Sequence, residues 1–267
     1  MARKCHFPDR NLCCPDDLIA ALFIDLDGTC VVCQPYYDGA IDEFGTLMQL
    51  CRLATKEEAI QTLRRVYYGS MPQRGFERAR FGEAIVEAYH QLCTKRRPPR
   101  KEITAICQSI GSRPFFRPPE VFPGCKPVLS RAQHNFLLVA VTVGDYEVQR
   151  YKMKQSGLDP IFDDHIITDT ENKPQVVQEF IKDVGIHPQY SGFIGNSMRS
   201  DGAVLSVTNV LYLPLESSLA RPEDKFPENT GFELFQARNW AECEQRGIMP
   251  LFRRRRKAME ETADACA

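Results

Sequence analysis

Short runs rich in apolar residues, each ending in turn residues, recur along the chain. The clearest cover residues 19–24, 136–143, 165–168 and 192–195. Runs of this length are typical of strands that are buried on both faces of a parallel sheet. Helical composition follows the second and third runs, over residues 147–155 and 174–184, and Gly157 and Gly185 stand where those helices would end. The repetition of strand, turn and helix predicts an α/β fold.

The connection between the first two runs is far longer than a sheet connection needs. Within it, four stretches have helical composition: residues 40–50, 56–67, 76–92 and 102–110. In the third stretch, apolar side chains recur at spacings of three and four, as on one face of a helix. Prolines cluster toward the end of the segment. The pattern predicts a separate helical unit, which we place at residues 34–118.

Two acids, Asp25 and Asp27, directly follow the first run. Ligands of open α/β sheets bind beyond the carboxyl ends of the strands, so this position is the rim of a site. An ordinary Asp-Gly turn would account for Asp27 and Gly28. It would not account for Asp25, because a carboxylate at the end of a buried strand is costly to desolvate without a compensating cation. Clustered carboxylates suit Mg²⁺, and the pattern favours a Mg²⁺ phosphoryl-transfer site.

Residues 25–29 read Asp-Leu-Asp-Gly-Thr, and this resembles the first motif of the haloacid dehalogenase-like (HAD) hydrolases, most of which are phosphatases. Three further motifs follow in the family's order. They are a strand ending in Thr142, a Lys173 where a loop meets a helix, and a Gly-Asn pair with a later acid, Asn196 and Asp201. Alone, Thr142 would be a β-branched residue closing a strand and Lys173 a solvated residue at a helix start. The ordered set identifies the chain as a member of the HAD superfamily.

The resemblance implies a Rossmann-like parallel sheet sandwiched by helices, formed by residues 18–33 and 119–250. It also implies that residues 34–118 are a smaller α-helical cap domain that closes over the site and excludes water. Residues 1–17 are left as an N-terminal extension, and residues 251–267 as a C-terminal tail with basic and then acidic side chains.

The resemblance assigns a catalytic role to four side chains. Asp25 would be the nucleophile that forms an aspartyl-phosphate, and Asp27 would protonate the leaving oxygen and then deprotonate the attacking water. Thr142, Val143 and Lys173 would hold the phosphoryl oxygens. Asp25 must be ionised for this reaction, and we expect Mg²⁺ and Lys173 to favour its charged form.

The implied cofactor is Mg²⁺, held by Asp25, Asp27, Asn196 and Asp201. Asn196 departs from the family pattern, which has an acid there. An amide oxygen can still coordinate Mg²⁺ but carries no charge. Whether Asn196 or Asp201 is the direct ligand stays open.

The expected function is therefore Mg²⁺-dependent hydrolysis of a small phosphorylated metabolite. Asp27 favours phosphoryl transfer over dehalogenation, because a halide leaves without a proton and dehalogenases of this fold lack an acid there. Two alternatives stay open: a phosphoglucomutase-like phosphotransferase, and a non-catalytic binding or regulatory protein in which Asn196 marks a decayed metal site.

Composition restricts the partners. The chain of 267 residues carries 35 acidic and 34 basic side chains, and the resulting net charge of -1 gives no general attraction to nucleic acid. No apolar stretch is long enough to span a membrane, and residues 1–16 lack the apolar core of a signal peptide. We expect a cytoplasmic protein with a small-molecule substrate, no membrane partner and no nucleic-acid partner. Oligomeric state is left open.

Two groups of basic residues are further candidate binding sites. The basic run at residues 253–257 reads as a solvated tail rather than a nucleic-acid or membrane patch, because acidic residues follow it. Tyr36 and Tyr37 lie just past the first motif, and Arg74, Arg78 and Arg80 cluster at the start of the third helical stretch. The arginines could bind a carboxylate or a second phosphate but read better as a solvated basic helix face.

The chain has eleven cysteines, an odd number at irregular spacings, which predicts reduced thiols. Cys30 and Cys33 form a Cys-x-x-Cys pair beside the first motif that could be sensitive to oxidation. Cys5, Cys13 and Cys14 with His6 are a weaker candidate for a metal site in the N-terminal extension.

Overall fold

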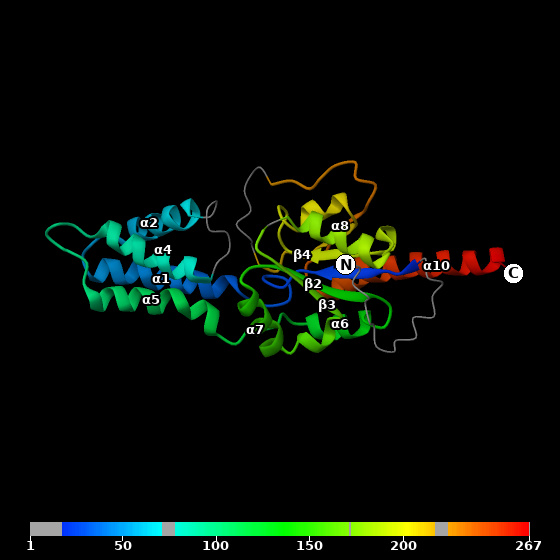
Figure 1. Cartoon of the computed structure of the whole chain (residues 1–267), viewed down its shortest axis with the longest axis horizontal. Helices are drawn as coiled ribbons and strands as arrows, with labels where there is room; N and C mark the ends of the chain where they lie inside the picture. The colour runs from blue at the N-terminus through cyan, green and yellow to red at the C-terminus, as the bar shows by residue number, and fades with distance from the viewer. Residues whose placement is uncertain (1–17, 71–77, 171, 217–223, 267) are drawn as a thin grey trace.

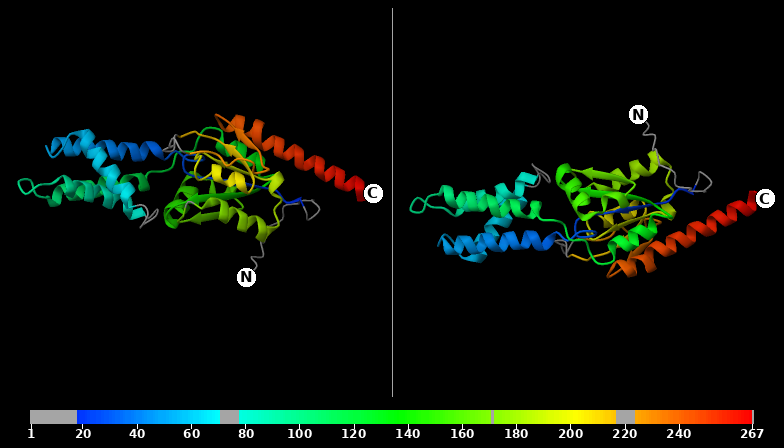
Figure 2. Two further views of the ribbon diagram at one scale, coloured as in Figure 1. Left: turned by 90° about the horizontal axis from the view of Figure 1, so that it is seen from above. Right: turned by 90° about the horizontal axis from the view of Figure 1, so that it is seen from below.

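The computed structural model describes residues 18–70, 78–170, 172–216 and 224–266. It has an α/β core, a helical cap on one side of the core, and a long C-terminal helix that extends from the other side (Figure 1). Figure 2 shows in two further views that cap, core and C-terminal helix follow one another along the long axis. The expected N-terminal extension, with Cys5, His6, Cys13 and Cys14, lies outside the described residues.

The core is built on one sheet of six strands, all paired in parallel. The strands are β1 (Ala21–Ile24), β2 (Leu137–Val143), β3 (Asp164–Thr168), β4 (Gly192–Gly195), β5 (Asn209–Tyr212) and β6 (Leu234–Gln236). Their order is β3-β2-β1-β4-β5-β6, so the direction of winding reverses at β1. Ligands bind at such reversal points in open α/β sheets. The topology confirms the predicted α/β fold with a Rossmann-like parallel sheet.

Helices cover both faces of the sheet. They are α6 (Cys125–Ala132), α7 (Tyr146–Ser156), α8 (Lys173–Val184), α9 (Trp240–Cys243) and α10 (Met249–Cys266), with short 3-10 helices at Asp159–Ile161, Pro188–Tyr190 and Gly202–Ser206 and a π-helical turn at Glu244–Ile248. The predicted helices correspond to α7 and α8, which end at Gly157 and Gly185 with φ of +68° and +77°. Glycine adopts this left-handed conformation without strain.

The apolar sequence of β1 is explained by burial on both sides of the sheet. Leu22 and Ile24 belong to an apolar cluster shared with α6, α9 and the start of α10. Ala21 and Phe23 belong to a second cluster shared with α8, where the rings of Phe23 and Phe180 meet edge-on at 5.9 Å. The sheet is therefore the middle layer of three.

Four helices form the cap and share an apolar core of their own. They are α1 (Gln34–Leu50), α2 (Lys56–Gly69), α4 (Arg78–Leu92) and α5 (Lys101–Phe116), and each overlaps one predicted helical stretch. The crossing of α4 and α5 is close at one point, because a Cβ atom added to Gly111 would lie 2.4 Å from the Cα atom of Gly82.

The basic run at residues 253–257 lies within α10 and is only partly solvated. Arg255 is buried and its Nη1 donates a hydrogen bond to the Asn135 carbonyl, so the interpretation as a solvated tail is wrong for this residue. Arg254 pairs with Glu233 at 2.7 Å and Arg256 with Glu260 at 2.9 Å. Across the described ranges, no helix combines the length and apolar character needed to cross a membrane.

Candidate active site

The four motifs meet at the carboxyl ends of the central strands. Asp25 follows β1, Thr142 lies near the end of β2, Lys173 begins α8 after β3, and Asn196 follows β4. β1 lies between β2 and β4, so the loops that follow these strands are neighbours. Side chains that lie 117 to 171 residues after Asp25 in the sequence are thus collected beside it at one edge of the sheet.

Asp25 lies at the centre of a buried charge network. Its Oδ1 accepts a hydrogen bond of 2.6 Å from Lys173 Nζ, which also donates to Asp201 Oδ1 at 2.6 Å. The side chains of all three residues are at most 7% exposed. The Asp25 backbone N–H donates to the Ile194 carbonyl at 2.9 Å, which fixes the end of β1 against β4.

Burial and the neighbouring charges together shift the pKa values of Asp25 and Lys173. Burial raises the pKa of Asp25 to about 7, although Lys173 acts to lower it, and Asp201 raises it further. Lys173 thus acts on the Asp25 pKa in the expected direction, but burial outweighs it. Burial also acts to lower the pKa of Lys173, but Asp201 and Asp25 outweigh it, and the net pKa is raised. Lys173 is the fixed positive charge of the site.

Asp27 lies in different surroundings, with 26% of its side chain exposed. Lys152 Nζ lies 2.7 Å from each of its carboxylate oxygens, and Gln149 Nε2 donates to Oδ2 at 2.9 Å. Gln149 and Lys152 are three residues apart on α7 and so share a face of that helix. Neither residue is predicted from the sequence. Their spacing on one helix face is visible there, but nothing in it connects α7 to the end of β1.

The turn between Asp25 and α1 is held by the core and depends on glycine. Gly28 has a φ of +77°, and a Cβ atom there would lie 2.3 Å from Asn196 Nδ2, so only glycine fits. Trp240 Nε1 donates to the Thr29 carbonyl at 3.2 Å. The Thr29 hydroxyl lies 3.0 Å from Asp25 Oδ2 and 3.3 Å from Asn196 Oδ1, so these two oxygens face the same point.

Asn196 and Asp201 differ in what their oxygens contact. Asn196 is 7% exposed, and its Nδ2 donates to the Glu216 carbonyl at 3.3 Å. Asp201 has no exposed surface; besides Lys173 on Oδ1, the Ser197 N–H donates to its Oδ2 at 2.8 Å. Both carboxylate oxygens of Asp201 are therefore engaged by the protein, whereas Asn196 Oδ1 faces the Thr29 hydroxyl shared with Asp25.

Thr142 carries a buried hydroxyl whose Oγ1 has no hydrogen-bond partner among the described residues. A buried hydroxyl without a hydrogen-bond partner is unfavourable. We therefore expect the Thr142 hydroxyl to form a hydrogen bond with a bound ligand. The next residue, Val143, accepts a hydrogen bond of 3.0 Å on its carbonyl from Gln149 Nε2.

A family model for haloacid dehalogenase-like hydrolases matches residues 19–205, a range that contains all four motifs. The chain belongs to this hydrolase family. The membership confirms the identification made from the order of the HAD motifs. By sequence alone, no curated protein matches the chain.

Solved HAD structures share the fold. A haloacid dehalogenase-like family hydrolase from Xanthomonas campestris has a TM-score of 0.74 at 19% identity, over 90% of this chain and 94% of that one. A predicted phosphoglycolate phosphatase from Haemophilus somnus has a TM-score of 0.54 at 16% identity, over 85% and 97%. L-2-haloacid dehalogenase from Xanthobacter autotrophicus has 0.56 at 14%, over 86% and 100%. Enzymes named for two different reactions share this fold, so the reaction must be argued from the site.

The donor atoms of this HAD site fit Mg²⁺. Within the described ranges, no three His, Cys, Asp or Glu side chains are grouped so that they could hold a metal by themselves. One carboxylate oxygen of Asp25 and the amide oxygen of Asn196 face the same point beside Thr29. Mg²⁺ takes one or two carboxylates and completes its shell with water and substrate phosphate. A small set of oxygen donors is therefore what this ion requires.

The cap meets the HAD core through Tyr37 and Glu216. Burial, and next the negative charge of Asp27, raise the pKa of Tyr37, so this cap residue lies near the site. Its ring contacts Phe81 and Phe115 edge-on, with ring centres 5.1 and 5.9 Å apart. The Glu216 carboxylate accepts backbone hydrogen bonds of 3.0 and 2.9 Å from Cys33 and Gln34, where the chain enters the cap.

Arg80 is buried in the cap, so the interpretation of the basic cluster as a solvated helix face is wrong for this residue. Its guanidinium carbon lies 4.1 Å from the centre of the Tyr67 ring, and its Nη1 donates to the Tyr67 carbonyl at 3.3 Å. Arg74 lies outside the described residues.

The cysteine pair beside the first motif is poorly suited to redox chemistry. Cys30 is fully buried. Burial raises the pKa of the Cys30 and Cys33 thiols well above the usual value, and the thiolate is the reactive form. Cys30 and Cys33 are both free thiols.

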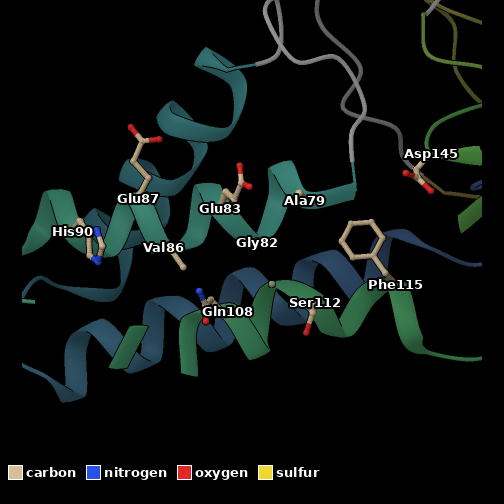
Figure 3. A pocket seen from close by; sticks show the side chains of 11 residues that line it. Ala79, Gly82, Glu83, Val86, Glu87, His90, Gln108, Ser112, Phe115 and Asp145 are labelled. Atoms are coloured by element: carbon tan, nitrogen blue, oxygen red, sulfur yellow. The ribbon is translucent and has the colours of Figure 1, made fainter. Parts of the chain in front are cut away.

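A cavity of about 730 Å³ lies between α4 and α5 of the cap (Figure 3). Ten of its eleven lining residues come from these two helices, and the eleventh, Asp145, follows the turn after β2 in the HAD core. The lining consists of Ala79, Gly82, Glu83, Val86, Glu87, His90, Gln108, Gly111, Ser112, Phe115 and Asp145. None of the predicted catalytic residues is among them.

Proposed function

We propose that this HAD protein is a Mg²⁺-dependent phosphatase that hydrolyses a small phosphorylated metabolite through an aspartyl-phosphate on Asp25. The observation that carries the proposal is the contrast between its two acids. Asp25 is buried against Lys173, whereas Asp27 is partly exposed and bound by Lys152 and Gln149. Two carboxyl groups in different surroundings are suited to two different roles in one reaction.

Asp25 is proposed to attack phosphorus in line with the leaving oxygen. Lys173 holds its Oδ1, so Oδ2 is the oxygen that faces Thr29 and Asn196. Asp25 and Asn196 are the residues that would hold Mg²⁺, which would offset the negative charge of the phosphoryl group and favour ionised Asp25. Asp201 then acts by holding Lys173, since both its oxygens are engaged within the protein.

Asp27 is proposed to give a proton to the leaving oxygen and then to accept one from the water that attacks the aspartyl-phosphate. Thr142 supports the binding of a phosphoryl oxygen next to it, because its buried hydroxyl is otherwise without a partner in the described part of the chain. Lys173 offers positive charge to the same group, and the backbone at Val143 follows Thr142 into the turn.

Three alternatives fit the site less well. A dehalogenase needs no proton donor at the leaving atom, so Asp27 would have no role in it. A phosphoglucomutase-like transferase would use the same two acids. It would also need residues that bind a second phosphate, and none is identified in the described part of this chain. A non-catalytic protein would have no reason to keep Asp25, Lys173 and Asp201 in one buried network. The predicted cytoplasmic location stays a prediction.

The test is a screen of phosphorylated metabolites together with p-nitrophenyl phosphate and a 2-haloacid, each with Mg²⁺ and with a chelator. We expect Mg²⁺-dependent phosphate release and no halide release. Halide release without phosphate release would contradict the proposal and indicate a dehalogenase. Failure to act on every compound in the presence of Mg²⁺ would favour a binding protein.

A further inference from the structure

Two residues of α7 hold the Asp27 carboxylate from one side. Lys152 Nζ lies 2.7 Å from both of its oxygens, and Gln149 Nε2 donates to Oδ2 at 2.9 Å. The Lys152 side chain is only 12% exposed, although its charge would ordinarily favour water. Three short contacts converge on the one acid of the site that is not part of the Lys173 network.

The position of Gln149 is itself fixed by the turn after β2. Its Nε2 also donates to the Val143 carbonyl at 3.0 Å, so one amide group links Asp27 to the predicted phosphate-binding turn. A Cβ atom at Gly144 would lie 2.7 Å from that Nε2, and Gly144 has a φ of +147°. Glycine is needed there to admit the Gln149 amide.

The helix that carries both residues is firmly anchored. Asp145 caps its N-terminus by accepting a hydrogen bond of 3.1 Å from the Val148 N–H. Gly157 ends it in a left-handed conformation, and Met153 packs in the core. Lys152 and Gln149 therefore reach Asp27 from a rigid base, as the support of a catalytic group requires.

We propose that Lys152 and Gln149 are positioning residues that hold the Asp27 carboxylate in the orientation needed for proton transfer at the leaving oxygen. The inference rests on the proposed phosphatase function. An Asp side chain turns freely about two bonds, and misplacement of a catalytic group by about 1 Å can cost on the order of a hundredfold in rate. The contacts from α7 restrict both bonds. Lys152 acts through Asp27 and is not assigned a contact with substrate.

The competing interpretation is an ion pair that only attaches α7 to the core. The two interpretations differ in how the rate should depend on the leaving group. Phenyl phosphate and p-nitrophenyl phosphate have nearly the same shape, but phenolate is the far more basic leaving group and needs a proton more. Loss of acid catalysis slows the phenyl ester more, whereas general structural damage slows both esters alike.

The variant Lys152→Met keeps the length of the side chain and removes the donor. We expect its kcat/KM on phenyl phosphate, which depends only on the steps up to loss of the leaving group, to fall about 10-fold to 100-fold, a part of what a general acid contributes. The fall on p-nitrophenyl phosphate should be several-fold smaller. The matched control is Lys154→Met, the same substitution at an exposed position on the same helix, and it should leave both rates unchanged.

A second comparison uses Asp27→Asn, assayed on p-nitrophenyl phosphate. Adding Lys152→Met to Asp27→Asn should cost little more, because the positioned carboxylate is already absent. Lys152→Arg, which keeps a charged donor, should recover part of the rate on phenyl phosphate. The comparison of Lys152→Arg with the wild-type protein remains usable if Lys152→Met folds poorly.

Equal losses on the two esters, or full additivity with Asp27→Asn, would overturn the positioning role and leave a structural ion pair. If the wild-type protein hydrolyses neither these esters nor any compound of the metabolite screen with Mg²⁺, the proposed function fails instead. The two failures are distinguished by the wild-type rates alone.

Discussion

Asp25 and Asp27 are two residues apart and have opposite surroundings. The Asp25 side chain is 7% exposed and touches Lys173; that of Asp27 is 26% exposed and touches Lys152 and Gln149. Each acid therefore has its own lysine. A nucleophile needs a fixed position next to a permanent positive charge, and an acid-base group needs access to the leaving oxygen and to water. The two environments match these two needs.

Substitution of each acid should have a different effect. Asp25→Asn should abolish phosphate release, because an amide cannot form the aspartyl-phosphate. Asp27→Asn should lower kcat on a phenyl ester by about 10²- to 10⁴-fold, the usual contribution of a general acid or base. Steady-state kinetics with thermal unfolding as the control measures both. Wild-type turnover by folded Asp25→Asn protein would show that the nucleophile is a different residue.

The buried hydroxyl of Thr142 should lower the stability of the folded protein, and we expect it to be kept because it binds the phosphoryl group. Replacing a buried hydroxyl that lacks a partner with a methyl group is neutral or favourable, so Thr142→Val should raise the free energy of unfolding by up to about 1 kcal/mol. The same change should raise KM or lower kcat, because the hydroxyl that is proposed to bind a phosphoryl oxygen is lost. Denaturant unfolding and phosphatase assays measure the two effects.

Thr208→Val is the matched control for Thr142. Thr208 is equally buried, but its hydroxyl donates to the Pro188 carbonyl at 2.8 Å. Its removal should lower stability by about 1 kcal/mol and leave activity unchanged. Similar stability losses at both positions would mean that Thr142 has an internal partner after all.

Sequence reasoning predicted the family residues but not the residues that hold them. Asp25, Thr142, Lys173 and Asn196 were found because their order along the chain matches a family pattern. Lys152 and Glu216 could not be predicted, because each acts on a residue far away in the sequence. Lys152 pairs with Asp27, 125 residues earlier, and Glu216 accepts a hydrogen bond from the backbone of Cys33, 183 residues earlier. The burial of Arg80 could not be predicted because its contact with Tyr67 depends on how α2 and α4 pack together.

At the scale of elements, the α4–α5 crossing depends on two small residues. A Cβ atom at Gly111 would lie 2.4 Å from the Gly82 Cα atom, so Gly111→Ala should push the helices apart and cost about 1 to 3 kcal/mol. Gly39→Ala in α1 is the matched control. No atom lies within 4 Å of its added Cβ, so it should gain about 0.5 to 1 kcal/mol from helix propensity.

Chemical denaturation of the two glycine variants measures this difference. A stability gain for Gly111→Ala, equal to that of Gly39→Ala, would show that α4 and α5 can separate without cost. Because the cavity of Figure 3 lies along this crossing, the same variant should change its shape without touching the catalytic network.

The elements predicted best were those with the strongest pattern. The strands β1 and β2 are buried along nearly their whole length and read as unbroken apolar runs. The edge strand β6 is three residues long and partly exposed, and β5 follows a short 3-10 helix, so neither gave a clear signal. The helical form of residues 253–257 was missed because a run of basic residues indicates charge and not conformation.

At the scale of the whole molecule, cap and core meet around the active site. Glu216 follows β5 and accepts hydrogen bonds from the backbone where the chain enters α1. Tyr37 of the cap lies close enough to Asp27 for the Asp27 carboxylate to raise the pKa of Tyr37. The site is therefore bordered by both parts of the molecule. Substrate choice is expected to depend on the cap side of this border.

Metal binding should stabilise the whole protein in a pH-dependent way. Asp25 has a pKa of about 7 in the folded chain and an ordinary value of 3.8 when unfolded. The folded chain therefore holds an extra proton between these values, and the stability that this proton contributes is lost as pH rises toward 7. Mg²⁺ must displace the proton at low pH but not at high pH.

Apparent Mg²⁺ affinity should accordingly be weaker near pH 5.5 than near pH 8. The increase in Tm on adding Mg²⁺ should be larger at the higher pH, and Asp25→Asn should lose the effect. Thermal unfolding at the two pH values measures it. An equal Tm increase at both would indicate that the ion binds away from Asp25.

The central claim is that Asp25 carries the phosphoryl group during the reaction. The most direct measurement is mass spectrometry of the Asp27→Asn variant, quenched in acid during turnover of p-nitrophenyl phosphate with Mg²⁺. Because p-nitrophenolate is a good leaving group, the aspartyl-phosphate can form without a proton from residue 27. The loss of the base slows hydrolysis of the aspartyl-phosphate, so this intermediate should accumulate. We predict a phosphoryl group on the peptide containing Asp25, absent with a chelator and in Asp25→Asn. A phosphoryl group on any other residue would contradict the account.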